Sequence, residues 1–220
     1  MAVTIANATN AGINYGRWAA ISNLTQLTIS AWVRVFSFGS SGLGRIASKE
    51  NGWLFYTTSN SGGVLQIGSG FSGGTANFYS TTQLPSGASV AWTHVAATWD
   101  GSGPAQSAFG LWIAGASSGL VSTASATGTK LDDSGIDLWI GNRSAGSRPI
   151  DGQIAEVAFW NALLTPAEIA ALSKGFSPSH IRPTAMRFHA PLVRDFRPLQ
   201  QNATIASSGV TVAPHPRIIL

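Results

Sequence analysis

The feature of this sequence that most constrains its fold is a repeated alternation of apolar and polar side chains at a spacing of two residues. Residues 27–35 read Leu-Thr-Ile-Ser-Ala-Trp-Val-Arg-Val, which places Leu27, Ile29 and Val33 on one face of an extended strand. Similar segments, rich in β-branched and aromatic residues, recur about every ten residues. They cover residues 53–56, 64–67, 77–80, 92–99, 109–113, 136–140 and 154–160. This spacing favours an antiparallel sandwich or barrel over βαβ units.

Turn and helix signals separate these strands. Asn-Gly at 51–52 and Asp-Gly at 100–101 are typical of tight turns. One helix is predicted after Thr165, because a proline follows at the first helical position and Glu168 completes a capping box. Gly175 marks its end. We therefore expect an all-β fold, an antiparallel β-sandwich with one short helix and an extended C-terminal arm.

The composition supports a large core but gives the surface few charges. Eight Trp and ten Phe supply extensive apolar area. Charged residues make up 10% of the chain, against about 25% in typical soluble domains, which excludes a disordered, charge-rich chain. The absence of Cys excludes disulfides and thiolate metal sites. So few charges fit either a neutral-surfaced lectin-like domain or a protein that works while assembled on something larger.

Membrane and secretion signals are missing from the sequence. No apolar run reaches the roughly 18 residues that a membrane helix needs. The first residues lack the basic segment and long apolar stretch of a signal peptide. We therefore expect no membrane association, and the four Asn-X-Ser/Thr sequons are interpreted as chance.

Positive charge is concentrated in the last fifth of the chain. From Lys174 onward the net charge is +5, whereas the preceding residues carry −1. We divide the chain into a domain of residues 1–176 and a C-terminal segment, 177–220, with a strand over 186–190 and a weak strand near 210–212. This arm is interpreted as a docking segment for an acidic partner surface, with a solvated basic tail as the alternative. Its docking residues would be Arg182, Arg187, Arg194, Arg197 and Arg217. A nucleic-acid partner is disfavoured, because these arginines are spread among prolines and apolar residues and do not form a basic cluster.

Several motifs resemble the jelly rolls of laminin-G-like and pentraxin domains, which belong to the concanavalin A-like group. Residues 92–101, Trp-Thr-His-Val-Ala-Ala-Thr-Trp-Asp-Gly, are similar to the W-x-H-V-A-x-T-Y/W-D-G hairpin of these domains. Further segments resemble their first long strand, their closing strands and helix, and the Phe-Ser-Pro of pentraxins. These segments are residues 28–33, 138–141, 151–157, 164–169 and 176–178. The resemblance spans roughly residues 25–192 and implies a jelly roll, a fold that hosts lectins, coat proteins and hydrolase accessory domains.

The end of the chain carries a second resemblance, to laminin-G-like proteins encoded by tailed bacteriophages. It rests on Arg-Pro at 182–183 and on residues 190–195 and 210–217. It implies a virion protein, a capsid decoration or a head or tail fibre component, made in the cytoplasm of a bacterial host. Its partners would be other virion proteins and further copies of itself in a homo-oligomer, for which we expect a trimer.

Catalysis is not predicted. Glycoside hydrolysis needs two carboxylates about 5–9 Å apart, and the glucanases of this fold carry them in alternation along one strand. The three Glu are Glu50, Glu156 and Glu168. Glu168 caps the predicted helix, and Glu156 has apolar residues two positions before and after it. His94 lies in an alternating strand, where a packed histidine is expected, and no Gly-x-Ser-x-Gly motif supplies a nucleophile.

Calcium is the cofactor that the family resemblance implies, yet the loop expected to hold it is not acidic. Residues 142–148 read Asn-Arg-Ser-Ala-Gly-Ser-Arg, with two arginines where carboxylates are expected. These cations would repel Ca²⁺, so we predict no metal in this loop and no cofactor. A different calcium site using Asp132, Asp133 or Asp151 is left open, because backbone carbonyls can supply further ligands.

The alternative function is a carbohydrate-binding module that recognises a host surface glycan. Sugar binding needs an exposed aromatic platform with polar groups beside it. Trp53, which follows the Asn-Gly turn, and Trp18, which lies outside the strand pattern, are the tryptophans expected to be exposed. Together with Asn142 and Arg143 they form the candidate glycan-binding set. The competing interpretation is that each tryptophan is buried in the core.

Overall fold

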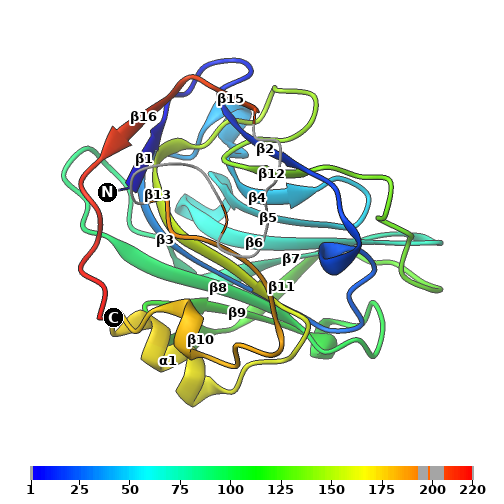
Figure 1. The fold of residues 1–220 in the computed structure, drawn as a ribbon. Coiled ribbons are helices and arrows are strands. Elements are labelled where there is room, and N and C mark those ends of the chain that lie inside the picture. Colours follow the sequence, from blue (N-terminus) through cyan, green and yellow to red (C-terminus); the bar gives the residue numbers. More distant parts are fainter. Residues whose placement is uncertain (1, 193–197, 199–205, 220) are drawn as a thin grey trace.

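Two antiparallel sheets face each other and enclose the core in the computed structural model (Figure 1). The structure describes residues 2–192, 198 and 206–219, and the statements below concern this part of the chain. Arg194 and Arg197, two of the predicted docking residues, lie outside it. The architecture confirms the predicted β-sandwich jelly roll with one short helix.

Sheet A has the strand order β10-β9-β8-β3-β13-β1-β16, and β14 pairs with a further stretch of β13. Its strands are β1 (Ala2–Ile5), β3 (Leu27–Ser37), β8 (Thr93–Trp99), β9 (Phe109–Ile113), β10 (Ala116–Ser118), β13 (Asp151–Trp160), β14 (Met186–Ala190) and β16 (Val210–Ala213).

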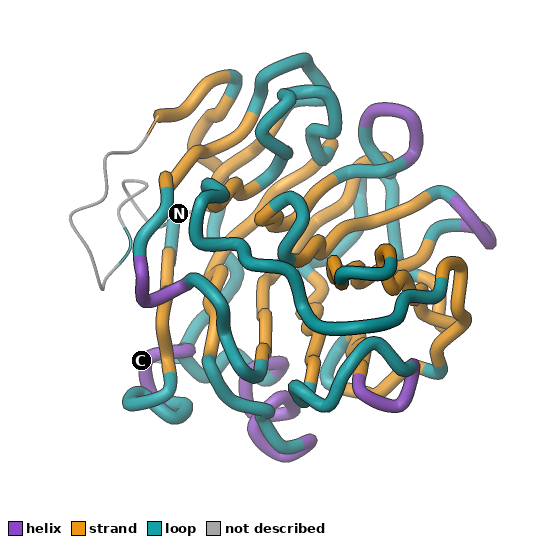
Figure 2. The backbone as a smooth tube through the Cα atoms, turned by 90° about the vertical axis from the view of Figure 1, so that its right-hand side faces the viewer, coloured by secondary structure: helices purple, strands orange, loops and turns teal. Residues whose placement is uncertain are grey.

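Sheet B has the order β11-β7-β6-β5-β4-β12-β2-β15. Its strands are β2 (Gly12–Gly16), β4 (Arg45–Lys49), β5 (Trp53–Thr58), β6 (Val64–Phe71), β7 (Gly74–Gln83), β11 (Leu120–Ala124), β12 (Leu138–Ile140) and β15 (Ala206–Ser208). Short 3₁₀ turns lie at the periphery of the strands (Figure 2). They are Ala19–Ile21, Ser40–Gly42, Asn60–Gly62, Gln106–Ala108 and Pro178–His180.

The core forms where the apolar faces of the two sheets meet. The alternation predicted for β3 places Ile29 and Val33 in this core. Trp53 on sheet B meets Phe159 on sheet A edge-to-face, with ring centroids 5.1 Å apart. Aromatic pairs of this geometry bury large apolar area and fix how the two layers pack.

The predicted helix is α1 (Pro166–Ser173), and its capping box is present. The Thr165 hydroxyl accepts a hydrogen bond from the Glu168 backbone N–H, and the Glu168 carboxylate accepts one from the Thr165 N–H. The buried side of α1 packs against the outer face of sheet A through Ile169 and Leu172. The segment before α1 covers the outer face of β3, where the buried Thr28 hydroxyl donates to the Ala162 carbonyl and accepts from the Leu164 N–H. No helix in the described residues has the length and apolar character needed to cross a bilayer.

The C-terminal segment supplies strands to both sheets. β14 pairs with β13 in sheet A, β15 forms the edge of sheet B, and β16 forms the edge of sheet A beside β1 (Figure 1). Gly209, with φ of 60°, joins β15 to β16, so that the chain passes from one sheet to the other. Near the end, the Ile219 N–H donates to the Gly175 carbonyl at 2.6 Å. The described parts of the arm are therefore held along the sandwich.

Candidate functional site

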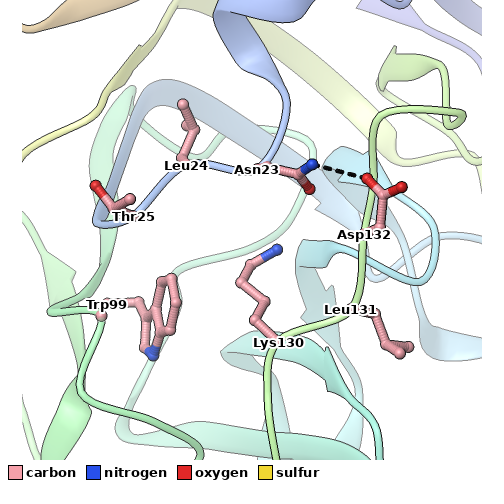
Figure 3. Close-up of a pocket in the computed structure, with 8 residues that line it drawn as sticks. Asn23, Leu24, Thr25, Trp99, Lys130, Leu131 and Asp132 are labelled. Atoms are coloured by element: carbon pink, nitrogen blue, oxygen red, sulfur yellow. Dashed lines mark hydrogen bonds between the residues drawn. The ribbon is translucent and has the colours of Figure 1, made fainter.

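A cavity of about 400 Å³ opens where the connection from β2 to β3, the end of β8 and the segment before β12 converge (Figure 3). We name it the Trp99 cavity. It is lined by Asn23, Leu24, Thr25, Trp99, Gly101, Lys130, Leu131 and Asp132.

Trp99 forms the aromatic wall of this cavity. It is the last residue of β8, and its indole Nε1 donates a hydrogen bond to the Gly103 carbonyl at 2.8 Å. The ring lies edge-on to Phe71 of β6, with centroids 6.2 Å apart. Leu24 is buried beside it and adds apolar surface. Core contacts fix the indole, which is 4% exposed, so the wall is preformed but presents only a small part of the ring to the cavity.

Polar groups surround this apolar wall. The Lys130 ammonium points into the space between Trp99 and Asn23, with Nζ 5.9 Å from the indole centroid (Figure 3). The Asn23 amide donates to the Asp132 carboxylate at 2.7 Å, and the exposed Thr25 lines the cavity while its hydroxyl donates to the Asn161 side chain at 3.2 Å. An apolar face beside amide, hydroxyl, ammonium and carboxylate groups matches the mixed surface of a sugar ring.

Asp133 lies behind the cavity and ties its walls together. Its carboxylate accepts hydrogen bonds from the Asn23 backbone N–H at 2.7 Å, from Lys49 at 3.3 Å and from Lys130 at 3.4 Å. Lys49 also donates to the Ile21 carbonyl at 3.2 Å. Burial lowers the pKa of Lys49, and the nearby Asp133 carboxylate opposes this shift. The network fixes the loop after β2 to the segment before β12.

Asp132, by contrast, is exposed at the cavity. Hydrogen bonds from the Ser134 backbone N–H and the Asn23 side chain lower the pKa of Asp132 to about 2. It is therefore ionised near neutral pH and available to accept hydrogen bonds from a ligand.

Of the three residues left open for calcium, Asp133 does not fit that ion and Asp151 lies apart from the other two. The Asp133 oxygens accept from N–H groups and face two ammonium groups, which would repel Ca²⁺. Asp151 lies apart from them at the start of β13, where it accepts from the Ser37 hydroxyl. In the described residues, no three acidic or histidine side chains gather closely enough to hold a metal ion.

The expectation that Trp53 is exposed is wrong, because its side chain is only 2% exposed and packs inward on Phe159. The alternation of β5 buries Trp53 together with Phe55, and this outweighs the turn signal that precedes them. Trp18 is half-buried, with its ring 6.0 Å from that of Phe188, and it does not line the Trp99 cavity.

Asn142 and Arg143 occupy the connection between β12 and β13. Asn142 is buried and shapes this connection: its amide donates to the Ala11 carbonyl at 2.6 Å and accepts from the backbone N–H groups of Arg143 and Arg148. Arg143 is half-exposed and lines a second cavity, to which Trp53 also contributes. The structure thus brings Trp53 and Arg143 to one cavity, with Asn142 behind it and Trp18 elsewhere.

The described docking arginines are spread over the C-terminal segment. Arg182 forms an ion pair with Glu168 of α1. Arg187 donates to the Thr184 carbonyl at 2.9 Å, and Arg217 is exposed near the end of the chain. They do not form one compact cluster on the described surface.

The groups tested for catalysis are held in structural contacts. Glu156 sits at a bulge in β13 with φ of 51°, where its carboxylate lies 2.7 Å from His189 Nε2 and 3.1 Å from His215 Nε2. Burial favours its neutral form, but the hydrogen bonds from the two histidines outweigh this effect and lower the pKa of Glu156. Burial also lowers the pKa of His94 to about 3, and its Nε2 lies 2.8 Å from the Ser30 hydroxyl. His94 is therefore a neutral, packed histidine.

Of the residues that line the Trp99 cavity, the sequence singled out Asp132 alone as a candidate site residue, as a possible calcium ligand. Trp99 was assigned to a strand motif, and Asn23 was noted only as a sequon. The one usable signal was the Asp-Gly turn after Trp99, which places the indole at a strand end.

The family model of the concanavalin A-like lectin/glucanases superfamily, laminin G type, matches residues 7–170. The chain belongs to this superfamily. This confirms the resemblance to laminin-G-like jelly rolls. A search of curated proteins returns no match.

Solved structures show the same fold at low sequence identity. A Bacteroides ovatus protein assigned to carbohydrate binding has a TM-score of 0.69 at 17% identity, over 100% of this chain and 61% of that one. The heptameric SAP-like pentraxin of Limulus polyphemus has a TM-score of 0.64 at 14% identity, and the match covers 97% of this chain and 94% of the pentraxin chain. Tailspike protein 2 of Escherichia coli O157:H7 bacteriophage CAB120 has a TM-score of 0.58 at 15% identity, and the match covers 88% of this chain and 27% of the tailspike chain. This chain thus spans less than two thirds of the Bacteroides protein and about a quarter of the tailspike.

Proposed function

We propose that this chain is a non-enzymatic glycan-binding module that serves as a structural component of a bacteriophage particle. The observation that carries the binding function is the Trp99 cavity, where a fixed indole meets the polar groups of Asn23, Thr25, Lys130 and Asp132. Largely preformed, concave sites with a few placed polar groups are typical of small-ligand binding. The carbohydrate binding assigned to the Bacteroides ovatus protein supports the same ligand class.

The proposal excludes glycan cleavage because Asp132 is the one acidic side chain among the described residues that line the Trp99 cavity, and three other acids are held in fixed contacts. Glu156 is held between two histidines, Glu168 caps α1, and Asp133 is paired with two lysines. A glycosidase needs one carboxyl group to donate a proton and a second to act as base or nucleophile. The fixed pairing of these carboxylates favours binding without cleavage.

The test is a glycan array of bacterial surface polysaccharides, followed by titration of any glycan that binds. Thr25→Arg places a bulky side chain at the exposed rim of the cavity without emptying the core. We expect it to weaken binding by about ten-fold or more, or about 1.4 kcal/mol. Ser117→Arg adds the same charge on the exposed edge strand β10 and should leave binding unchanged.

Absence of binding to every polysaccharide on the array would remove the glycan function. Equal weakening by both arginine variants would show that added charge, and not occupancy of the cavity, alters binding. Cleavage of a bound glycan would contradict the non-enzymatic part of the proposal.

The virion role has separate support from the C-terminal segment. Three apolar side chains remain exposed there and beside α1: Val212 is 55% exposed, Ile219 47% and Phe176 41%. Apolar groups on a surface with so few charges favour attachment to another protein. The fold shared with a phage tailspike supports the same setting. We propose that this surface, together with Arg182, Arg187, Arg194, Arg197 and Arg217, attaches the chain to a capsid or fibre, where it self-associates.

Particle incorporation tests this attachment. Truncation would remove strands from both sheets, so the test uses Ile219→Lys and Val212→Lys, which change exposed side chains. We expect a several-fold lower content in purified particles with an unchanged circular dichroism spectrum, whereas the matched variant Val121→Lys, on the far edge of sheet B, should be incorporated normally. Undiminished incorporation of both C-terminal variants would refute the proposed attachment surface.

A further inference from the structure

A second cavity, of about 270 Å³, lies beside strands β4, β5 and β6 and the start of β7. We name it the Arg45 cavity. It is lined by Arg45, Glu50, Asn51, Trp53, Leu54, Ser69, Gly70, Thr75 and Arg143. None of these residues lines the Trp99 cavity, so the two can be altered separately.

Arg45 is the unusual residue of this cavity. It is only 6% exposed, yet its Nε and Nη1 have no hydrogen-bond partner in the part of the chain that the structure describes. The face of its guanidinium stacks on Tyr56, with Cζ 4.2 Å from the ring centroid. The closest carboxylate oxygen, on Glu50, is 3.9 Å from Nε, beyond hydrogen-bond distance. A buried charged donor left unpaired is costly, and a ligand that reached an edge of this guanidinium would supply the missing partner.

A second guanidinium is fixed at the same cavity. Asn142 holds the backbone of its loop, and Ser147 accepts from the Arg143 Nε at 3.0 Å and from its Nη2 at 2.8 Å. The remaining Nη1 lies 4.0 Å from Glu50. Arg143 is therefore oriented toward the cavity before any ligand arrives.

The charges at this cavity do not balance. Burial lowers the pKa of Arg45, and the charges of Arg143 and Arg148 lower it further, which places three cations close together. Among the described residues, Glu50 is the acidic side chain that lines the cavity, and one of its buried oxygens also has no hydrogen-bond partner. The site thus has an excess of positive charge and unused donors beside one unused acceptor.

We propose that the Arg45 cavity binds the carboxylate of an acidic sugar. The carboxylate accepts hydrogen bonds from one edge of the Arg45 guanidinium, where Nη2 is paired with either Nε or Nη1, and from Nη1 of Arg143. Glu50 accepts hydrogen bonds from the sugar hydroxyls, and Asn51 and Thr75 line the same space. The volume lies below the 300–1,000 Å³ usual for larger ligands and suits a small one.

Glu50 also distinguishes between anions. A doubly charged phosphate or sulfate would be repelled by this carboxylate and would offer it no hydroxyl donor, whereas a sugar acid carries one negative charge and several hydroxyls. The mixture of guanidinium and carboxylate groups therefore favours a sugar acid over a bare inorganic anion.

The test is calorimetric titration of the full chain with sialic, glucuronic and galacturonic acids, with glucose and galactose as neutral controls and with inorganic phosphate and sulfate. We expect at least one sugar acid to bind and its neutral counterpart not to bind. Arg143→Gln and Arg45→Lys should each weaken that binding by about ten-fold or more, because each removes hydrogen bonds to a charged group. Glu50→Gln should tighten binding of the bare carboxylate acetate, since it removes the competing negative charge.

Failure of all three sugar acids to bind would overturn the proposal, as would equal binding of a sugar acid and its neutral counterpart. Phosphate or sulfate binding as tightly as the sugar acids would show a general anion site and overturn the assigned ligand class. If Arg45→Lys does not fold, Arg143→Gln decides the outcome, because its side chain is half-exposed. Thr25→Arg should leave this binding unchanged, which keeps the result independent of the function proposed for the Trp99 cavity.

Discussion

Two buried charged groups, Arg45 at the start of β4 and Asp133 in the segment before β12, differ in how they are satisfied. Asp133 accepts from a backbone N–H and from two lysines, so its hydrogen-bonding capacity is used within the protein. Arg45 is almost as inaccessible, but two of its nitrogens have no partner in the described residues. The first group holds loops in place, and the second retains capacity for a ligand.

The difference shows that burial of charge does not by itself indicate a binding site. Structural ion pairs and ligand sites both contain buried charges with shifted pKa values. What separates them here is whether donors and acceptors remain unused after the protein has folded. Three substitutions, in order of decreasing expected effect, would sharpen or break this comparison.

Asp133→Asn should have the largest effect on folding. It leaves the fully buried Lys49 ammonium without a counter-charge, and breaking a buried pair in this way costs about 3–5 kcal/mol. Urea denaturation at neutral pH measures the change in the free energy of unfolding. Asp132→Asn, next to it but exposed, is the matched control and should cost much less. Equal losses would show that Asp133 does not hold the network together.

Glu156→Gln should have an intermediate effect that depends on pH. The folded pKa of Glu156 is lowered, so its stabilising contribution is present above the ordinary value of 4.5 and is lost as the pH falls through the folded pKa. At neutral pH we expect the variant to lose about 1.5–3 kcal/mol, the worth of hydrogen bonds to a charged group. The difference from the natural chain should shrink below pH 4.5. A difference that stays constant with pH would contradict an ionised Glu156.

Arg45→Met should have the smallest effect on folding, in contrast to Asp133→Asn. Methionine removes the unpaired donors and keeps apolar bulk against Tyr56, and replacing a poorly satisfied buried charge in this way is often neutral or stabilising. We expect the free energy of unfolding to stay within about 1 kcal/mol or to rise. A loss as large as that of Asp133→Asn would make Arg45 a structural residue and remove the contrast between the two groups.

The sequence predicted the long central strands and the helix well. β3, β8 and β13 follow the alternation, and the capping box at Thr165 marks where α1 begins. The short strands β1, β2, β4, β10, β11 and β15 were not predicted. β4 carries Arg45 and Lys49 at its two ends, and such charged residues are not expected in a strand that is buried throughout.

The candidate site was predicted only in part. Arg143 was placed in the glycan-binding set, and the structure puts it at the Arg45 cavity. Trp53 lines the same cavity but faces the core. Arg45 and Glu50 were missed, because neither belongs to a local sequence motif. What marks them is that buried polar atoms of both side chains have no hydrogen-bond partner in the described residues, which only the folded structure shows.

By itself, the sequence determined the class of fold, because alternation at a spacing of two residues is a local property that needs no knowledge of distant partners. Only the tertiary structure decided which charges meet. Asn23 and Asp133 are separated by 110 positions along the chain and are joined where strand ends from both sheets converge. The packing of distant segments gives the Asp133 carboxylate three hydrogen-bond donors and leaves two Arg45 nitrogens without an acceptor in the described residues. Which hydrogen-bond partners a buried side chain meets depends on how the strands and their connections pack.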